Sequence, residues 1–266
     1  AFLYANNRLR VNHWRSQAAR YGQTVAVDGR QVFYRLTGAG TTTIAIETGL
    51  ATPSAEWWQL QDQLSPFARV LTFDRPGYGW SDPGPSPRTA SVEATDLQAL
   101  LRNAGLEGPF VLVAHSYGAL AARTYAARYP AEAAGLVLVD PSHPSQFDQQ
   151  RCDPACLPRA IPADVDPAYR VAPWLARLGA LRLLGGDRTG LFEWARALPP
   201  GSQAALLDLL TSTGHWATGA EEWIHLPESA EQARALVSIG DKPLRVVSAG
   251  RTLTDGAARR FMPARP

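Results

Sequence analysis

The order of short apolar segments along the chain constrains its fold more than any other feature of the sequence. Five runs have the composition of strands that are buried on both faces, and they lie at residues 43–47, 69–73, 110–114, 136–139 and 244–248. Helical patterns separate the first four runs, at residues 55–64, 89–103 and 117–129. Strands that alternate with helices predict an α/β fold, in which helices flank a mostly parallel, twisted sheet.

A hairpin is predicted before the first of these runs. Residues 23–27 and 31–36 have strand-like composition, and the pair Asp28-Gly29 lies between them. This pair is typical of two-residue turns, because both positions must adopt positive φ. We therefore expect two further strands at the start of the sheet.

The alternation stops after the fourth run. No strand pattern occurs from residue 142 to residue 241, and half of the eight tryptophans fall there. Short helices are predicted instead, at residues 173–184, 191–198, 202–211 and 228–238. We interpret this stretch as a helical cap over the sheet. Its tryptophans either line an apolar pocket or simply pack the cap onto the sheet.

This pattern divides the chain into three parts. Residues 1–22 form a basic leader, residues 23–141 and 242–266 form the core, and residues 142–241 form the cap. With 26 basic and 24 acidic side chains the formal charge is only +2, which argues against binding to nucleic acid. No apolar run reaches the roughly 18 residues that a membrane-spanning helix needs.

The N-terminal residues leave the location of the protein open. The chain begins at Ala1, its one methionine is Met262, and four arginines but no acidic residue fall within residues 1–27. The apolar stub at residues 2–5 is either the end of a removed signal or membrane anchor, or part of an ordinary basic surface helix. The first alternative predicts an exported protein or one close to a membrane, and the second a cytoplasmic one.

The two cysteines allow two interpretations as well. Cys152 and Cys156 are four positions apart, and no further ligand has the spacing that a metal site needs. They form either a small disulfide loop in an exported protein or two free thiols.

The strongest chemical signal is the segment Ala114-His115-Ser116-Tyr117-Gly118, which follows an apolar strand and precedes a helix. A serine on so sharp a turn needs small residues two positions away on either side, since larger side chains would clash. The helix that follows directs its N–H groups toward developing negative charge. The alternative is a serine that merely caps a helix.

Two other segments follow strands. Glu47-Thr48-Gly49-Leu50-Ala51 comes after the run at 43–47, and residues 74–81 read Asp-Arg-Pro-Gly-Tyr-Gly-Trp-Ser. Together with the serine segment and with Asp140 after the run at 136–139, they resemble the α/β-hydrolase superfamily. The first of them is similar to the oxyanion loop of a subgroup with Glu-x-Gly-Leu. The resemblance covers residues 23–145 and 242–255.

The resemblance implies roles for particular residues. Ser116 would be the nucleophile, and the backbone N–H groups of Leu50 and Tyr117 would form the oxyanion hole. A serine nucleophile implies an acyl-enzyme and hence cleavage of an ester, thioester, lactone or amide. The family places its acid at positions that match Asp140 or Asp255, and we prefer Asp140 because a strand leads directly to it.

The histidine of the triad is harder to assign. In this fold it follows the acid and an eighth strand, but residues 250–266 contain no histidine. Three interpretations stay open: the histidine lies on a C-terminal segment absent from this sequence, His143 or His215 replaces it, or the scaffold has no triad. His13 lies in the leader, His115 precedes the serine, and His225 lies in the cap.

Taken together, these features predict a serine hydrolase that cleaves carboxylic esters of small or medium apolar acyl groups. The alternatives are an amidase or peptidase of the same fold, or a non-catalytic binding protein built on it. No glycine-rich phosphate loop precedes a helix, so we expect no nucleotide cofactor, and we expect no metal. The expected partner is a small-molecule ester.

Overall fold

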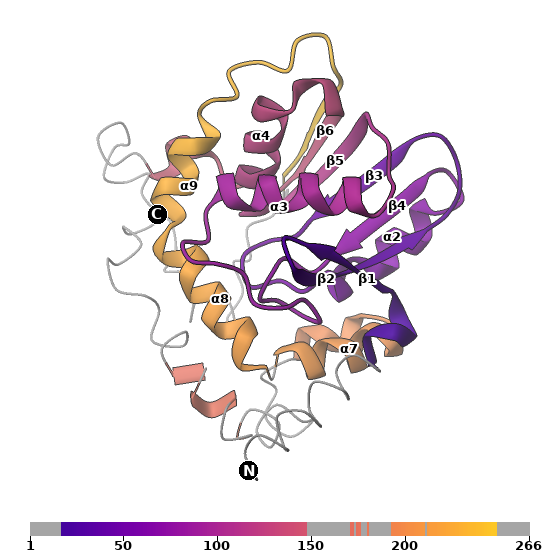
Figure 1. Cartoon of the computed structure of the whole chain (residues 1–266), viewed down its shortest axis with the longest axis vertical. Coiled ribbons are helices and arrows are strands. Elements are labelled where there is room, and N and C mark those ends of the chain that lie inside the picture. The colour runs from indigo at the N-terminus through magenta and orange to yellow at the C-terminus, as the bar shows by residue number, and fades with distance from the viewer. Residues whose placement is uncertain are drawn as a thin grey trace.

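The computed structural model describes residues 17–147, 171–172, 174–176, 180, 193–210 and 212–248. Asp255, Cys152, Cys156 and the leader up to residue 16 lie outside these residues, as does most of the helix predicted at 173–184. Within the described part, one seven-stranded sheet is flanked by helices (Figure 1).

The sheet has the predicted strands. They are β1 (Gln23–Val27), β2 (Arg30–Thr37), β3 (Thr43–Glu47), β4 (Arg69–Phe73), β5 (Phe110–His115), β6 (Ala133–Val139) and β7 (Leu244–Val247). Their spatial order is β1-β2-β4-β3-β5-β6-β7. Strands β3 to β7 pair in parallel, whereas β2 is antiparallel to both β1 and β4. The predicted α/β fold with a mostly parallel sheet is therefore confirmed.

The central strands are mostly apolar because both faces of the sheet are covered. On β5, Leu112 and Ala114 pack with the helices α3 (Ala90–Asn103) and α4 (Gly118–Arg128). Val113 points the other way, into a cluster that includes Leu64 of α2 (Trp58–Leu64). Successive side chains of a strand alternate between faces, so each face of this strand contributes to a separate core.

The hairpin turn is formed by the predicted pair. Asp28 and Gly29 have φ values of +48° and +80°, and Val27 pairs with Arg30. Both central residues thus adopt the left-handed conformation that a two-residue hairpin of this type requires.

The region between β6 and β7 is helical where it is described. Its elements are η3 (Pro144–Phe147), η4 (Glu193–Ala197), α7 (Pro200–Leu210), α8 (Thr213–Ile224) and α9 (Leu226–Ala233). Figure 1 shows α7, α8 and α9 following one another around the side of the sheet. At one end α7 packs against Trp58 and Trp80, and at the other Leu226 and Ala230 of α9 pack against Tyr117. Trp174, which we expected to line a pocket or to pack on the sheet, is 65% exposed.

Helix α8 was not predicted from the sequence. It contains Gly214, Gly219 and two threonines, all of which are weak helix formers. A local cap and a tertiary contact compensate: the Ser212 side chain accepts a hydrogen bond from the His215 N–H, and the backbone at Gly214 approaches Gly77 closely. Residues 193–197 form a 3₁₀ helix rather than the expected α-helix, and α9 ends before residue 238.

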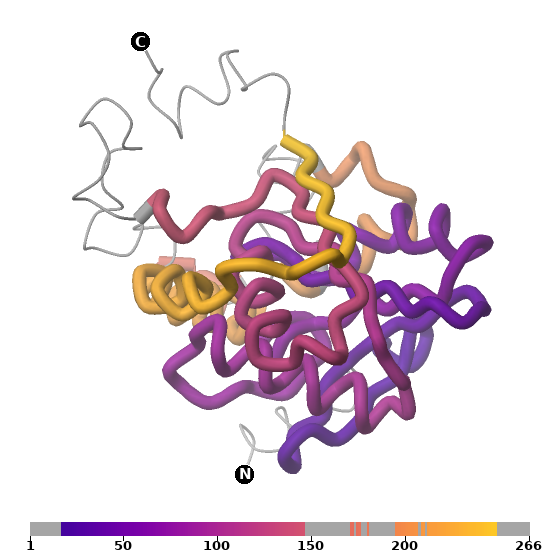
Figure 2. Tube along the Cα trace, turned by 90° about the horizontal axis from the view of Figure 1, so that it is seen from above, coloured from indigo at the N-terminus to yellow at the C-terminus, as the bar shows by residue number. Residues whose placement is uncertain are grey.

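Strand β7 differs from the prediction of a strand buried on both faces. It pairs with β6 at one margin of the sheet (Figures 1 and 2). Leu244, Val246 and Val247 are 45%, 56% and 54% exposed. Among the described residues, no helix is long and apolar enough to cross a membrane.

Gly118 provides a test of how tightly α4 packs against the end of β3. A Cβ atom there would lie 2.4 Å from the Thr48 carbonyl oxygen and 2.8 Å from that of Glu47. We expect Gly118→Ala to lower the free energy of unfolding by about 1–3 kcal/mol, because backbone atoms must shift to admit the methyl group. Urea unfolding measures this change.

Gly201→Ala is the matched control. A Cβ atom at Gly201, in α7, meets nothing within 4 Å. This variant should be neutral or more stable by up to about 1 kcal/mol, since alanine favours the helix. Equal effects of the two substitutions would contradict the close packing of α4 on β3.

Candidate active site

Ser116 lies on the turn that connects β5 to α4. Its φ is +48°, in the left-handed region that residues with a side chain seldom adopt. Ala114 is fully buried two residues earlier, and Gly118, two residues later, packs against the end of β3. The backbone at Ser116 is therefore strained, and both flanking positions require a small residue.

Asp140 lies directly beside this turn. The Ser116 N–H donates a hydrogen bond of 3.2 Å to the carbonyl of Val139, the last residue of β6. Asp140 has a φ of +40° and is exposed, and its N–H donates to the Val247 carbonyl at 2.6 Å. The preferred acid thus follows the strand next to that of the serine, whereas Asp255 lies outside the described residues.

Leu50 and Tyr117, the residues expected to form an oxyanion hole, belong to one packed region next to the serine turn. Leu50 follows β3 and packs on the buried cluster that contains Tyr117. In the described part of the chain, neither backbone N–H donates to an acceptor, whereas the next one, Ala51 N–H, donates to the Tyr78 hydroxyl at 3.1 Å. Two free N–H groups in this position can stabilise an oxyanion.

Among the described residues, neither His143 nor His215, the two replacement histidines, forms a hydrogen bond with Ser116 or Asp140. Nδ1 of His143 accepts a hydrogen bond from the Ser145 N–H at 3.1 Å, so the neutral ring carries its proton on Nε2. A triad histidine has the opposite tautomer. His215 is fully buried, and both of its ring nitrogens lack a hydrogen-bond partner among the described residues. Burial and the nearby charge of Arg75 lower the pKa of His215 to about 3.

His115, next to the serine, has a packing role instead. Its ring lies 5.5 Å from that of Trp57, and it fills the space that a Cβ atom on Gly49 would need. Burial lowers the pKa of His115, and the charge of Asp140 opposes this shift. The neutral ring therefore stays packed beneath the loop that carries Leu50.

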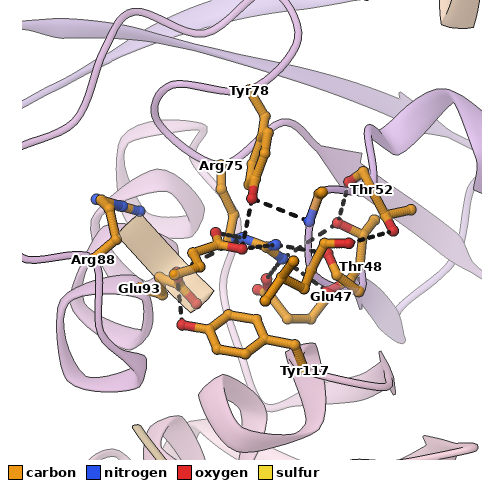
Figure 3. Close-up of polar contacts among 12 residues, drawn as sticks. Glu47, Thr48, Thr52, Arg75, Tyr78, Arg88, Glu93 and Tyr117 are labelled. Carbon is orange, nitrogen blue, oxygen red and sulfur yellow. Dashed lines mark hydrogen bonds and ion pairs between the residues drawn. The ribbon is translucent and has the colours of Figure 1, made fainter. Parts of the chain in front are cut away.

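A buried network of charged groups lies behind this loop, and we did not predict it (Figure 3). At its centre is Arg75, which is 1% exposed. Its Nη1 donates to Glu47 Oε1 at 2.7 Å and to the Thr48 carbonyl at 2.8 Å, and its Nη2 donates to the Gly49 carbonyl at 2.7 Å. On the other side, Nε and Nη2 donate to the two carboxylate oxygens of Glu222, at 2.9 and 3.1 Å.

Two tyrosines complete this network. The Tyr78 hydroxyl donates to Glu222 Oε2 at 2.6 Å, and the Tyr117 hydroxyl donates to Glu93 Oε1 at 3.1 Å. Both rings also face the guanidinium of Arg75, with centroids 5.1 and 5.5 Å away. The network therefore connects the residue after the serine to helix α8.

Burial raises the pKa of two carboxyl groups in this network, those of Glu47 and Glu93. It raises the pKa of Glu47 to about 7, although Arg75 opposes the shift. Burial and the charge of Glu222 raise the pKa of Glu93 well above its ordinary value, whereas Arg75 and Arg88 oppose this shift.

The sequence contained a partial signal for this network. Glu47 ends an apolar strand, and Arg75 lies in a motif used for the family resemblance, without a role of its own. Charged residues at the ends of buried strands suggest a buried pair. No such signal marks Glu222, on a helix that the sequence did not predict. Among the described residues, no cluster of His, Cys, Asp and Glu could hold a metal ion.

Comparisons with known proteins agree with this architecture. Residues 42–168 match a family model described as the alpha/beta hydrolase fold. Cfl2 from Burkholderia cenocepacia is similar in structure, with a TM-score of 0.64 and 25% identity over 86% of this chain and 80% of that one. For N-formylmaleamic acid deformylase from Pseudomonas putida, the TM-score is 0.60 at 20% identity, over 86% and 82% of the two chains. These matches show that the chain has the α/β-hydrolase fold.

Curated relatives match part of the chain. An AB hydrolase superfamily protein from Gibberella zeae is 35% identical over 131 residues, which are 47% of this chain and 40% of that protein. The uncharacterized protein YqjL of Bacillus subtilis is 33% identical over 105 residues, 40% of this chain and 42% of that one. The aligned part spans about two fifths of the length of both relatives.

Glu56, next to Trp57, makes the stability of this region depend on pH. Burial without a charged partner raises its pKa from 4.5 to about 7. The proton bound to Glu56 contributes its full share of the free energy of unfolding below pH 4.5. This contribution is lost as the pH rises to about 7. We expect Glu56→Gln to be nearly neutral at pH 4.5 and to stabilise the protein by about 1–2 kcal/mol at pH 8. Urea unfolding at both pH values measures the difference.

Glu107→Gln is the control for this substitution, because Glu107 is exposed. It should leave the pH dependence of unfolding as it is in the unsubstituted protein. A Glu56→Gln variant with that same pH dependence would refute the burial effect.

Proposed function

We propose that the protein is a serine hydrolase that cleaves carboxylic esters through an acyl-enzyme on Ser116. The observation that carries this proposal is the strained Ser116, with a φ of +48°, directly before Tyr117, against whose cluster Leu50 packs. A serine used only as a helix cap does not need a left-handed backbone.

In the proposed reaction, Ser116 Oγ attacks the ester carbonyl carbon and forms the new C–O bond. The carbonyl oxygen becomes an oxyanion and accepts hydrogen bonds from the Leu50 and Tyr117 N–H groups, each of which contributes roughly 3–4 kcal/mol. A histidine takes the serine proton and passes it to the departing alkoxide as the ester bond breaks. Water then releases the acyl group by the same steps.

The histidine and the acid are parts of this proposal too. Because neither His143 nor His215 is hydrogen-bonded to Ser116 or Asp140 among the described residues, we propose that the base belongs to a part of the polypeptide outside them. Asp140 would hold it in the right tautomer, since its exposed carboxylate follows the strand beside Ser116.

The surroundings of the serine favour an apolar acyl group of small or medium size. Trp57 lies against His115, with 5.5 Å between the ring centroids, and Leu50 is only partly buried beside Tyr117. These side chains offer apolar surface near the serine turn without adding a charge to it.

A fluorophosphonate probe tests the nucleophile in the full polypeptide. Such a probe reacts with an activated serine, so we expect labelling of the unsubstituted protein and none of Ser116→Ala. Ser65→Ala, at the end of α2, is the control and should be labelled normally. An unlabelled unsubstituted protein would indicate a non-catalytic scaffold, and faster turnover of p-nitroanilides than of p-nitrophenyl esters would indicate an amidase.

Two matched substitutions test the acid. Asp140→Asn should lower kcat for a p-nitrophenyl ester by about 10⁴-fold, because the histidine would adopt the wrong tautomer. Asp255→Asn should change kcat little. The opposite pattern would assign the acid to Asp255 and refute the role of Asp140.

A further inference from the structure

The loop that carries Leu50 is held by side chains of another segment. Arg75 donates to the carbonyls of Thr48 and Gly49 at 2.8 and 2.7 Å, and the Tyr78 hydroxyl accepts from the Ala51 N–H at 3.1 Å. Three consecutive peptide groups are thus held by Arg75 and Tyr78.

These contacts determine where the Leu50 N–H points. The peptide between Gly49 and Leu50 is trans, so its C=O and N–H point in opposite directions. Because the Gly49 oxygen faces the buried guanidinium of Arg75, the Leu50 N–H faces away from it. This N–H is the one that we assign to the oxyanion hole.

Both Arg75 and Tyr78 depend on one carboxylate. The two oxygens of Glu222 accept from Nε and Nη2 of Arg75 at 2.9 and 3.1 Å, which fixes the plane of the guanidinium. Oε2 also accepts the Tyr78 hydroxyl proton at 2.6 Å, so the lone pairs of that hydroxyl remain available to Ala51. Glu222 is fully buried and comes from α8, 147 residues after Arg75.

We infer that Glu222 is a positioning residue: through Arg75 and Tyr78 it orients the Leu50 N–H toward the oxyanion. Helix α8, which carries Glu222, therefore helps to form the oxyanion hole. The inference rests on the proposed serine hydrolase. It assigns to the region between β6 and β7 a role in transition-state stabilisation beyond covering the sheet.

Glu222→Gln tests this role with little change in shape. Glutamine has one side-chain acceptor oxygen, whereas three donors converge on Glu222, so at least one donor loses its acceptor. We expect kcat for a p-nitrophenyl ester to fall about tenfold to hundredfold, as for a misplaced oxyanion donor, while KM stays within about threefold. Glu221→Gln on the same helix is the control, because Glu221 is 38% exposed and bonds to Ser86 instead.

Amide hydrogen exchange of Ala51 gives a readout that does not need catalysis. Its N–H is protected by the Tyr78 hydroxyl, so exchange should be faster in Glu222→Gln and unchanged in Glu221→Gln. If the unsubstituted full polypeptide shows neither labelling nor hydrolysis, the proposed function fails, and the exchange rates alone still decide whether Glu222 holds the loop.

Tyr78→Phe covers the case in which Glu222→Gln does not fold. It removes the acceptor of the Ala51 N–H but keeps the ring against Arg75 and the pair between Arg75 and Glu222. The inference predicts a lower kcat with little change in KM, and faster exchange at Ala51. If Glu222→Gln or Tyr78→Phe shows the same kcat, KM and Ala51 exchange rate as Glu221→Gln, the inference is overturned.

Discussion

The buried guanidinium of Arg75 is the interaction on which the arrangement of this site depends. Burying an ion costs several kcal/mol unless charged and polar partners replace its water shell. Here two carboxylates, two carbonyls and a hydroxyl surround it. These partners come from the end of β3 and from α8, so satisfying one side chain holds these segments together. Loss of either carboxylate would leave a buried charge only partly compensated.

Close packing also maintains the strained backbone at the serine turn. Left-handed backbone at Ser116, Asp140 and Ala51 persists only where the surroundings fix it. The close contact of Gly118 with the end of β3 fixes the serine, and the hydroxyl of Tyr78 fixes Ala51. The positions of Ser116 and of the loop that carries Leu50 therefore depend on packing and hydrogen bonds behind the loop as much as on the residues that face a substrate.

Local patterns were sufficient to predict most of the sheet. The apolar runs and the Asp28-Gly29 turn depend on contacts within a strand or between neighbours in sequence, and the structure confirms both. The prediction for β7 was wrong in its burial, because an apolar run does not show whether the margin of a sheet is covered. Helix α8 was missed because its glycines and threonines are weak helix formers, and its contacts with Gly77 and Arg75 are with residues distant in sequence.

By itself, the sequence determined the class of fold and the serine segment, since strand periodicity, turn residues and small flanking residues are local properties. Only the tertiary structure decided which buried charges meet. The partner of Arg75 is Glu222, 147 residues further along the chain, and no local pattern marks so distant a pair. A buried charge takes whichever partner the packing of the whole chain brings within hydrogen-bonding distance, and here that packing connects α8 to the loop beside the serine.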